Sequence, residues 1–392
     1  MAKVGGSKVK TTGRLTVLVI GMAVAALTAA LAGSVTPVHS APVLQQGFTN
    51  SHVVSGLTNP TDMEFAPDGR LFITEDTGRV RIAKPDGTPL TTFLDISSKV
   101  DSLGERGLLA LTFDPGFSTN HYVYLHYTRK ATSTTPPHNR VVRVTASGDS
   151  AVAGSEQLIF RLGNQSAANE FPQFMGGALD FKNGKLYVAT GDNDTPDKAQ
   201  QLTNLFGKML RINKDGTIPT NNPFYATASG NNRAIWARGL RNPFKFAIQP
   251  GTGAIFINDV GEHTWEEINR GAAGANYGWP VHEGRANDPP YVDPIFAYGH
   301  GSTGTTGCAI TGGTFYNPPT VDFPAQYVGD YFFADFCNGW IRVRNSDGTV
   351  SGFATGLERP IDLEVSQAGE LYYLSRSSTG IVGKIYAGNQ TP

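Results

Sequence analysis

The 392-residue sequence is poor in charged residues and has no excess of either sign. Charged residues make up 17% of the chain, and the formal net charge is −1. Nucleic-acid-binding proteins usually carry a basic excess, so we expect no nucleic-acid partner. Glycine and proline, in contrast, are abundant, with 46 and 24 residues. This composition is typical of a loop-rich β protein rather than a helical bundle.

Long apolar runs are also scarce, since only residues 15–33 form one that approaches the length of a membrane span. Basic residues precede this run, and Val38 and Ser40 are placed for cleavage before Ala41. The pattern predicts a secretory signal peptide over residues 1–40, followed by a single domain over residues 41–392. An uncleaved anchor is the alternative, because about 19 apolar residues can nearly span a bilayer. Either way we expect the body of the protein to be exported, and cleavage of the signal would leave no membrane span.

The chain has only two cysteines, Cys308 and Cys337. An even number in an oxidising compartment favours one disulfide between them, which would contribute about 3–4 kcal/mol by restricting the unfolded chain. Two reactive thiols are the alternative. Without a Cys-x-x-Cys spacing the pair makes a weak zinc site.

Common catalytic fingerprints are absent as well. The segment GGALDF (176–181) lacks the G-x-G-x-x-G spacing and the following helix of a dinucleotide site. Neither a G-x-S-x-G elbow nor an H-E-x-x-H motif occurs. The function must therefore be sought in less common patterns.

A recurring phrase is present instead, in which a turn with Gly or Asn precedes a strand of alternating aromatic and β-branched residues. Several copies add a second turn and a strand with Val or Ile. The copies lie at residues 67–84, 120–144, 183–192, 251–261, 328–344 and 368–386.

Six hairpin units around one core predict an all-β fold, a six-bladed β-propeller with four-stranded blades. A sandwich would need fewer hairpins, and a TIM barrel would need helical patterns. We expect residues 48–57 to close the ring with the last blade, and short helical insertions at 197–210 and 263–269. Propellers bind ligands with loops at one end of the channel, so the functional residues should lie in loops.

The loop motifs resemble, in their order, those of the glucose/sorbosone dehydrogenase family. The resemblance covers residues 54–386, nearly the whole mature chain. The motifs that carry it are LGERGLLALTFDPGF (103–117), GGALDF, FGKMLRINKDGTIPTNNPF (206–224), ARGLRNPFKFAI (237–248), NDVGEHTWEEINRGAAGANYGWPVHEG (258–284), CAITGGTFY (308–316) and RPIDLEVSQAGELYYL (359–374).

The resemblance implies oxidation of an aldose or oligosaccharide by pyrroloquinoline quinone (PQQ), with electrons passed to an external acceptor. A base takes the proton of the C1 hydroxyl while the C1 hydride moves to the quinone. A calcium ion polarises the quinone carbonyl, and cationic side chains stabilise the developing negative charge.

Three residues match cofactor contacts of the family. Arg241 and Asn242 in GLRNPF match an Arg-Asn pair, and Arg359 matches one of two arginines in the last blade. An arginine can donate a fork of hydrogen bonds to a carboxylate or quinone oxygen, so Arg241 is also a candidate catalytic residue. The alternative is a structural arginine that connects loops of different blades.

Two calcium sites are implied by the same resemblance. The backbone carbonyls of Gly261 and Glu262 match ligands of the ion beside the cofactor, and carbonyl oxygens suit a hard cation. A further calcium is bound near the positions of Glu267 and Tyr277. Alternatively, EEIN and NYGWP are structural turns.

The position of the family's catalytic histidine is occupied by Phe174, which cannot accept a proton. A lysine of the glucose dehydrogenases aligns with Cys337, and the second arginine of the last blade is Ile361. Glu105 stands where a glutamine binds sugar in some members, and Tyr298 where an aromatic side chain lines the sugar pocket.

General-base assistance supplies about 10²–10⁴-fold in rate, so oxidation without a histidine at position 174 requires a substitute. Glu105 is the candidate catalytic residue, and the other candidates are Glu170, His263, His282 and His300. The competing hypothesis is a catalytically inactive propeller that binds a sugar or a protein.

Overall fold

The computed structural model describes residues 41–84, 90–166, 168–377 and 379–388, all within the unit Ser40–Pro392. The predicted signal segment, residues 1–40, lies outside the described residues. Within the described ranges no helix is both long enough and apolar enough to cross a membrane.

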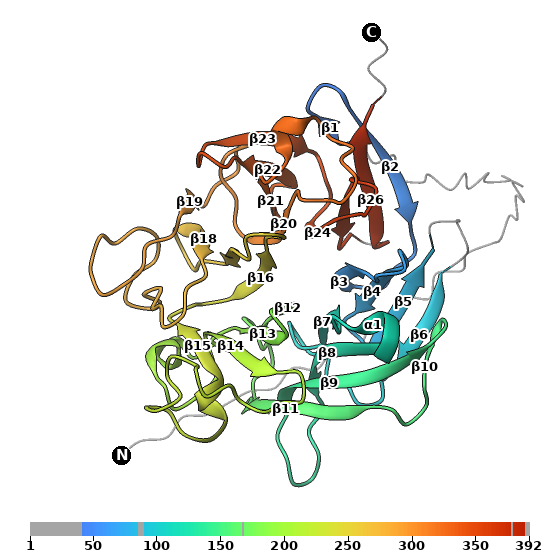
Figure 1. Cartoon of the computed structure of the whole chain (residues 1–392). Helices are drawn as coiled ribbons and strands as arrows, with labels where there is room; N and C mark the ends of the chain where they lie inside the picture. The colour runs from blue at the N-terminus through green and yellow to red at the C-terminus, as the bar shows by residue number, and fades with distance from the viewer. Residues whose placement is uncertain (1–40, 85–89, 167, 378, 389–392) are drawn as a thin grey trace, which may run out of the picture. The chain divides into compact units, whose positions relative to one another are not determined.

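Six antiparallel sheets follow one another along the chain and are arranged in a ring (Figure 1). The innermost strand of each sheet contacts the innermost strand of the next, and β24 of the last sheet contacts β3 of the first. The fold is therefore a six-bladed β-propeller, as predicted. The inner strands are β3 (Pro60–Phe65), β7 (Leu108–Phe113), β12 (Gly176–Lys182), β16 (Pro243–Ile248), β20 (Ile310–Phe315) and β24 (Pro360–Val365).

The six repeated hairpins of the sequence supply the middle strands of the blades. The second strands are β4 (Leu71–Glu75), β8 (Tyr122–Arg129), β13 (Lys185–Thr190), β17 (Ile255–Asp259), β21 (Tyr331–Asp335) and β25 (Leu371–Ser375). The third strands are β5 (Arg79–Ala83), β9 (His138–Ser147), β14 (Lys208–Asn213), β18 (Trp265–Arg270), β22 (Trp340–Arg344) and β26 (Ile381–Ala387).

The outer strands complete the blades and close the ring. They are β6 (Thr91–Asp95), β10 (Ser150–Ala151) with β11 (Gln157–Asn164), β15 (Ile235–Arg238), β19 (Phe296–Gly299) and β23 (Val350–Thr355). The sixth outer strand is β2 (Phe48–Val54), which pairs with β26 of the last blade. This confirms the predicted closing strand. The short β1 (Val43–Leu44) pairs with β23 and so extends the fifth blade.

Helices are few and short in the described chain. They are α1 (Phe117–Asn120) and the 3₁₀ turns η1 (Pro196–Gln200), η2 (Gly230–Ala234) and η3 (Ala325–Tyr327). Of the helix expected over 197–210, only the short turn η1 forms. The residues from Lys208 onward belong to β14 instead, because they pair with β13. The helix expected over 263–269 is wrong. These residues lead into β18, where pairing with β17 and β19 overrides the local helical pattern.

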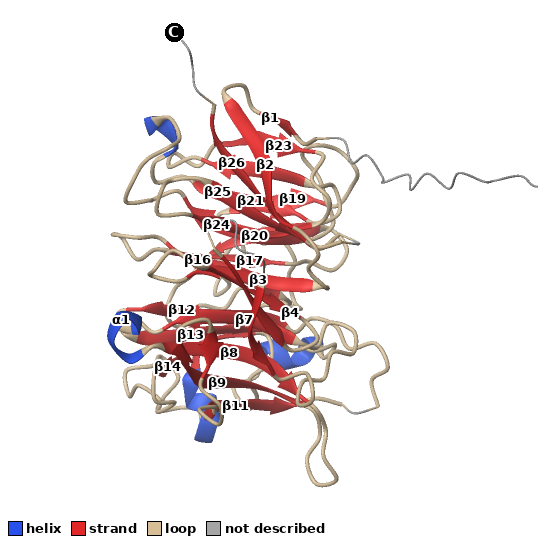
Figure 2. Cartoon of the chain, turned by 90° about the vertical axis from the view of Figure 1, so that its right-hand side faces the viewer, coloured by secondary structure: helices blue, strands red, loops and turns tan. Residues whose placement is uncertain are grey.

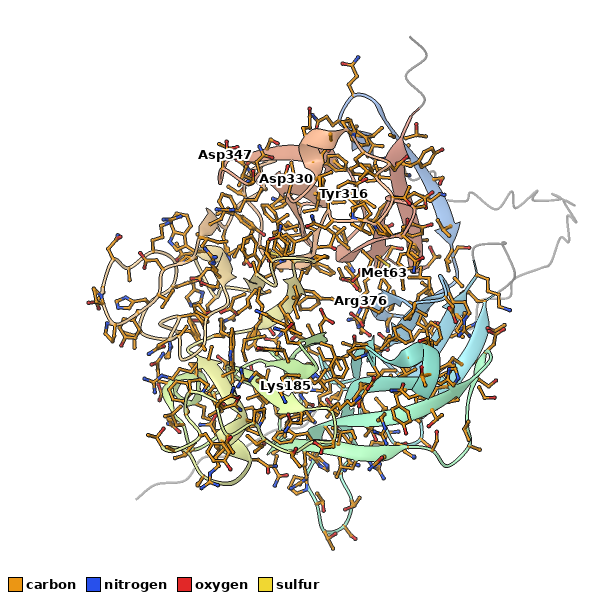
Figure 3. All side chains as sticks on the ribbon, viewed as in Figure 1. Met63, Lys185, Tyr316, Asp330, Asp347 and Arg376 are labelled. Carbon is orange, nitrogen blue, oxygen red and sulfur yellow. A yellow bond between two sulfur atoms is a disulfide. The ribbon has the colours of Figure 1, made fainter. Side chains whose placement is uncertain are left out.

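The hydrophobic core lies between neighbouring blades. Every residue of β4 and of β21 is buried, because a middle strand of a blade is covered on both faces by adjacent sheets. Phe72 and Phe113 contact each other edge to face across the first two blades, with ring centroids 5.0 Å apart. Side chains fill the space between neighbouring sheets in this way around the ring (Figure 3).

The middle of the ring is crossed by a buried ion cluster. The Lys245 ammonium from β16 binds the carboxylates of Asp62 on β3 and Asp362 on β24. Asp62 also accepts the Leu111 N–H, and Asp362 accepts the Met63 N–H, both at 2.8 Å. These contacts join four of the six blades across the channel.

The strands run between two ends of the propeller, both formed by loops (Figure 2). Because neighbouring strands are antiparallel, the loop before each inner strand lies at the same end as the loop between the second and third strands. We call this the first end, and the opposite one the second end. Each inner strand also has a β-bulge or register shift near its start, next to the first end. Such irregularities re-aim side chains and are frequent beside active sites.

Candidate active site at the first end of the channel

The Gly176–Gly177 pair at the start of β12 is required by close backbone approaches. Gly176 has φ +63°, and a Cβ atom there would lie 2.7 Å from the Gly191 nitrogen. Gly177 has φ +148°, and its Cβ would lie 3.0 Å from the Cβ of Leu109. Only glycine fits both conditions without strain. The pair therefore lets the loop before β12 pack tightly against neighbouring chain at the first end.

Phe174, in that loop, is held in an unusual conformation. Its φ is +56°, in the left-handed region that non-glycine residues rarely adopt. Its N–H donates to Glu105 Oε2 at 2.8 Å, and its carbonyl accepts the Asn193 N–H at 3.1 Å. The phenyl ring lies 3.8 Å from the guanidinium carbon of Arg241. The loop thus presents the side chain at position 174 to Arg241.

Arg241 is buried at the centre of this cluster. Its backbone N–H and that of Asn242 donate to the Asp259 carboxylate, at 3.0 and 2.7 Å. The guanidinium donates to the carbonyls of Val260 and Gly261. Asn242 Oδ1 accepts the Gly176 N–H at 2.9 Å, which connects the arginine loop to the glycine pair. The structure therefore brings together three motifs that are far apart in sequence, at residues 176, 241–242 and 259–261.

An acidic residue at the end of the second strand fixes the loop before the inner strand in several blades. Glu75 accepts the Thr58 N–H, and Asp259 accepts those of Arg241 and Asn242. Asp335 accepts the N–H groups of Cys308 and Ala309 in the fifth blade. These acidic residues were not among the predicted site residues, although the repeated acid in TED, TGD, IND and FAD is a visible signal in the sequence.

Trp279, which was not among the predicted site residues, is a further member of the cluster. Its ring lies 5.5 Å from the guanidinium carbon of Arg241, on the same cation as Phe174. The indole N–H donates to Asp192 Oδ2 at 2.8 Å. Burial raises the pKa of Asp192 to about 6, and its bond to Trp279 opposes this rise. The Arg241 guanidinium is thus in contact with two aromatic rings.

The predicted calcium ligands lie directly behind Arg241. The Gly261 carbonyl is directed toward the guanidinium, and the Glu262 N–H donates to Glu283. Glu267 is buried next to Asp259, around a cavity of about 10 Å³. The Tyr277 hydroxyl is engaged with the Arg270 carbonyl and the Ala272 N–H. Among the described residues no group of three His, Cys, Asp or Glu side chains is placed to hold a metal ion.

Burial shifts the titration of the two carboxylates in that region. It raises the pKa of Glu267 to about 7. Burial also raises the pKa of Asp259 well above its usual range, and the nearby Glu267 raises it further. Two buried carboxyl groups that repel each other suit a hard cation, which would favour their charged forms.

The remaining predicted residues differ in their access to this cluster. Arg359 is exposed at the first end, with its guanidinium carbon 5.7 Å from the Phe336 ring. Tyr298 is only 4% exposed, and its hydroxyl donates to Asp335 at 2.9 Å. A sugar contact through Tyr298 would require that bond to break. Ile361 is buried in the core, so this position offers no cation to the first end.

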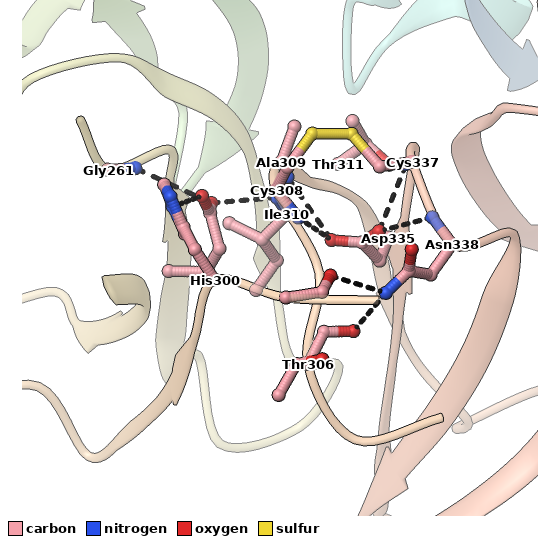
Figure 4. Close-up of a disulfide and its surroundings, with 12 residues drawn as sticks. Gly261, His300, Thr306, Cys308, Ala309, Ile310, Thr311, Asp335, Cys337 and Asn338 are labelled. Carbon is pink, nitrogen blue, oxygen red and sulfur yellow. Dashed lines mark hydrogen bonds and ion pairs between the residues drawn. A yellow bond between two sulfur atoms is a disulfide. The ribbon is translucent and has the colours of Figure 1, made fainter. Parts of the chain in front are cut away.

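The predicted disulfide between Cys308 and Cys337 is present (Figure 4). It joins the loop before β20 to the loop between β21 and β22. Asp335 lies beneath it and accepts the N–H groups of both cysteines. The position that aligns with a lysine in the glucose dehydrogenases thus carries a structural bridge.

The fold and this buried polar cluster define a propeller whose candidate site lies in the loops between blades. Residues 57–380 match the family model Glucose / Sorbosone dehydrogenase. The chain belongs to this family, as the sequence motifs indicated.

Several relatives are similar along much of the chain. The aldose sugar dehydrogenase YliI of Escherichia coli is 29% identical, over 84% of this chain and 90% of the relative. Quinoprotein glucose dehydrogenase B of Acinetobacter calcoaceticus is 27% identical over 66% of this chain and 57% of the relative. Human hedgehog-interacting protein is 30% identical over 54% of this chain but only 33% of the relative.

A solved structure agrees with the fold. The apo form of the soluble aldose sugar dehydrogenase of Escherichia coli superposes with a TM-score of 0.75 at 26% identity. The match covers 87% of this chain and 100% of that one.

Proposed function

We propose that the protein oxidises an aldose, free or at the end of an oligosaccharide, at C1 to the lactone. PQQ is the oxidant, calcium assists at the cofactor site, and the electrons pass to an external acceptor. The observation that carries the proposal is the position of Arg241. Its buried guanidinium lies at the first end of the channel beside two aromatic rings and donates to the Gly261 carbonyl.

The residues at the first end fit an anionic, planar group such as PQQ. Arg241, Arg359 and Arg376 place three guanidinium groups in the loops of this end, and Arg376 points toward the middle of the ring (Figure 3). The buried oxygen atoms of Thr77 and Asn193 have no hydrogen-bond partner there. Guanidinium groups bind carboxylates in a bidentate fashion, and free hydroxyl and amide groups can complete the contacts. When bound, PQQ would supply the two-electron acceptor for the C1 hydride.

Calcium fits the donor set behind Arg241. The carbonyls of Gly261 and Glu262 would hold the ion beside the cofactor, and Glu267 with Tyr277 a second ion. Oxygen donors at a buried, repelling carboxylate pair match the preference of Ca²⁺. The Gly261 carbonyl would exchange its bond to Arg241 for the ion, which frees the guanidinium to face the cofactor.

Glu105 and Asn242 shape the site from the side of the second and fourth blades. Asn242 fixes the glycine pair of β12, and Glu105 fixes the backbone of Phe174. Burial raises the pKa of Glu105, although its bonds to backbone N–H groups and the charge of Arg241 oppose this rise. A carboxyl group can contact a sugar hydroxyl through its oxygen atoms, which supports Glu105 as a substrate-binding residue.

A second candidate function is a propeller that binds a sugar or a protein without oxidising it. The observation that favours it is Phe174, whose ring covers one face of the Arg241 guanidinium. The similarity to hedgehog-interacting protein, whose name describes a binding partner, adds to it. In either case we propose that the protein acts outside the cytoplasm, because of the signal-like residues 1–40.

Reconstitution distinguishes the two functions. The purified chain is titrated with PQQ in the presence of Ca²⁺ while the cofactor absorbance is followed, and aldose-dependent dye reduction is then measured. The proposal expects saturable PQQ binding and turnover, with both weakened at least tenfold in Arg241→Ala. Sugar binding without PQQ binding or dye reduction would support the binding propeller instead.

A further inference from the structure

The proposed oxidation needs a proton acceptor, and position 174 does not supply one. We propose that His300, paired with Glu266, accepts the proton of the C1 hydroxyl. This inference rests on the proposed function and names the catalytic base for it. It is carried by a histidine–carboxylate pair that is built into the first end beside Arg241.

The pair is held with short, fixed contacts. His300 Nε2 lies 2.7 Å from Glu266 Oε1, and the Glu266 side chain is fully buried. Glu266 Oε2 accepts the N–H groups of Ile310 at 2.8 Å and Gly261 at 3.4 Å. The backbone N–H of His300 donates to the Thr264 carbonyl at 2.9 Å. This bond fixes the loop that carries the imidazole ring. In Figure 4 dashed lines run from His300 and from Gly261 to this carboxylate.

The contacts of Glu266 define the state of the imidazole. A buried carboxylate that already accepts two backbone N–H groups serves as an acceptor, so Nε2 of His300 carries the hydrogen. Nδ1 then keeps the free lone pair, and no described residue donates to it. The His300 side chain is 23% exposed, so the imidazole is only partly covered by the cluster. A neutral imidazole oriented by a buried carboxylate is the arrangement that general-base catalysis requires.

The pair shares one residue with the candidate cofactor site. Gly261 donates its N–H to Glu266, and its carbonyl accepts a bond from Arg241. Gly261 thus connects the Arg241 guanidinium to the histidine–carboxylate pair through two hydrogen bonds. The charged groups that act on His300 are Glu266, Glu283 and Arg241. The bond to Glu266 is the main cause that raises the pKa of His300, while burial and Arg241 oppose it.

The other candidate bases lack such an arrangement. Glu105 Oε2 is bound to the Phe174 N–H. His263 is 79% exposed, and His282 is paired with the exposed Asp288 at the surface. Glu170 is exposed in its loop. Of these candidates, His300 alone combines a buried carboxylate partner with a ring nitrogen left free.

The chemical step balances with these groups. The O–H bond of the C1 hydroxyl breaks, and its proton moves to His300 Nδ1. The C1–H bond breaks with its electron pair, and the hydride passes to the quinone oxidant, which is reduced by two electrons. The carbonyl of the lactone forms at C1. The imidazolium is stabilised by the Glu266 carboxylate until it releases its proton to solvent.

The test uses His300→Gln, with His52→Gln as the matched control because His52 is exposed on the closing strand β2. In the chain loaded with PQQ and Ca²⁺, kcat/KM for the aldose should fall about 10²–10⁴-fold in His300→Gln, while the Kd for PQQ stays within about threefold. His52→Gln should match the wild type. Glu266→Gln changes a positioning residue. In this variant, the limb of the pH profile that depends on His300 should shift to lower pH.

A readout without activity accompanies the kinetics. Histidine NMR of the metal- and cofactor-free protein should show the Nε2-protonated tautomer for His300 and a pKa above 6.5, which Glu266→Gln lowers. A wild type that binds PQQ and turns over, with His300→Gln retaining more than a third of kcat/KM, overturns the role of His300 alone. A wild type without aldose-dependent reduction overturns the proposed function and the base together. The opposite tautomer at His300 also overturns the inference.

Discussion

The phenyl ring of Phe174 lies 3.8 Å from the guanidinium carbon of Arg241, in a loop whose left-handed backbone points the ring at the cation. The loop therefore keeps a geometry that presents position 174 to Arg241 in the candidate site, although the side chain cannot take a proton. A separate histidine, His300, contacts the carboxylate of Glu266, which also accepts the Gly261 N–H. The most specific predictions therefore concern positions 174 and 300.

Returning a histidine to position 174 should matter only when His300 is lost. Phe174→His in the wild-type background should change kcat by less than about threefold, because the base is already present. In the His300→Gln background the same substitution should raise kcat at least tenfold above that of His300→Gln alone, since one base can assist by about 10²–10⁴-fold. Steady-state kinetics of the four variants measure this. Phe174→Leu in the same background is the control and should restore nothing. Equal effects of Phe174→His in both backgrounds would contradict the assignment of His300.

Glu283 should control the loop that bears the candidate calcium ligands. Its Oε1 accepts the N–H groups of Glu262, His263, Thr264 and Trp265 at 2.7–3.2 Å. Glu283→Ala should cost about 1.5–3 kcal/mol, as expected for bonds to a charged acceptor. Amide hydrogen exchange should increase in residues 262–265 and remain unchanged in β21, which is the internal control.

The same loop should loosen in acid. Burial raises the pKa of Glu283, but its bonds to four backbone N–H groups outweigh this and lower the pKa below 4.5. A carboxyl with a depressed pKa stabilises the fold above its unfolded value and loses that contribution as the pH falls through the folded value. Protection of residues 262–265 should therefore be complete above pH 5 and should decrease below about pH 4.5. Unchanged protection at pH 3 would contradict this account of the loop.

Calcium should stabilise the protein through Glu267 in a pH-dependent manner. Burial raises the pKa of Glu267 to about 7, so the metal-free fold loses stability as the pH rises from about 4.5 to 7. Relative to Glu267→Gln, the loss should reach up to about 3 kcal/mol, because one pKa unit corresponds to about 1.4 kcal/mol. Added Ca²⁺ should raise the melting temperature at pH 8 more than at pH 5, and Glu267→Gln should abolish the difference. If Ca²⁺ produced the same pH-dependent rise in melting temperature in Glu267→Gln, Glu267 would not be a ligand of the ion.

Lys245 should be essential for the stability of the ring. Lys245→Met leaves the buried carboxylates of Asp62 and Asp362 without their cation, which should cost about 3–5 kcal/mol in urea unfolding. Adding Asp62→Asn and Asp362→Asn to that variant should recover most of the loss, because the repelling charges are then removed. A loss below about 1 kcal/mol for the single variant would show that the cluster does not hold the blades together.

Much of the fold could be predicted because each blade repeats one local pattern. The turn-and-strand phrase marks the middle hairpin of every blade, and the closing strand at 48–54 follows from the need to complete the last sheet. The two expected helices failed because local spacing cannot show a ladder partner. Glu266 and Ile268 look helical in sequence, yet they pair with Tyr298 and Phe296 of β19.

The candidate site was predictable in part, for the same reason. Arg241, Asn242 and Phe174 were identified by their motifs, and the structure brings them into one cluster. Asp192 and Trp279 were missed, because 87 positions separate the two ends of their hydrogen bond. The pairing of His300 with Glu266 likewise depends on how the loop before β20 folds back over β18. From the sequence, His300 was only one of several candidate histidines.

The most direct test of the central claim is a single-turnover experiment under anaerobic conditions. The wild-type chain loaded with PQQ and Ca²⁺ is mixed with excess aldose, and the absorbance of the oxidised quinone is followed by stopped flow. The account predicts complete bleaching that is slowed about 10²-fold or more in His300→Gln and is slowed again when C1 of the sugar carries deuterium. Oxidised quinone that persists in the wild type, or an absence of bound quinone, would contradict the assignment of this propeller as a sugar oxidoreductase.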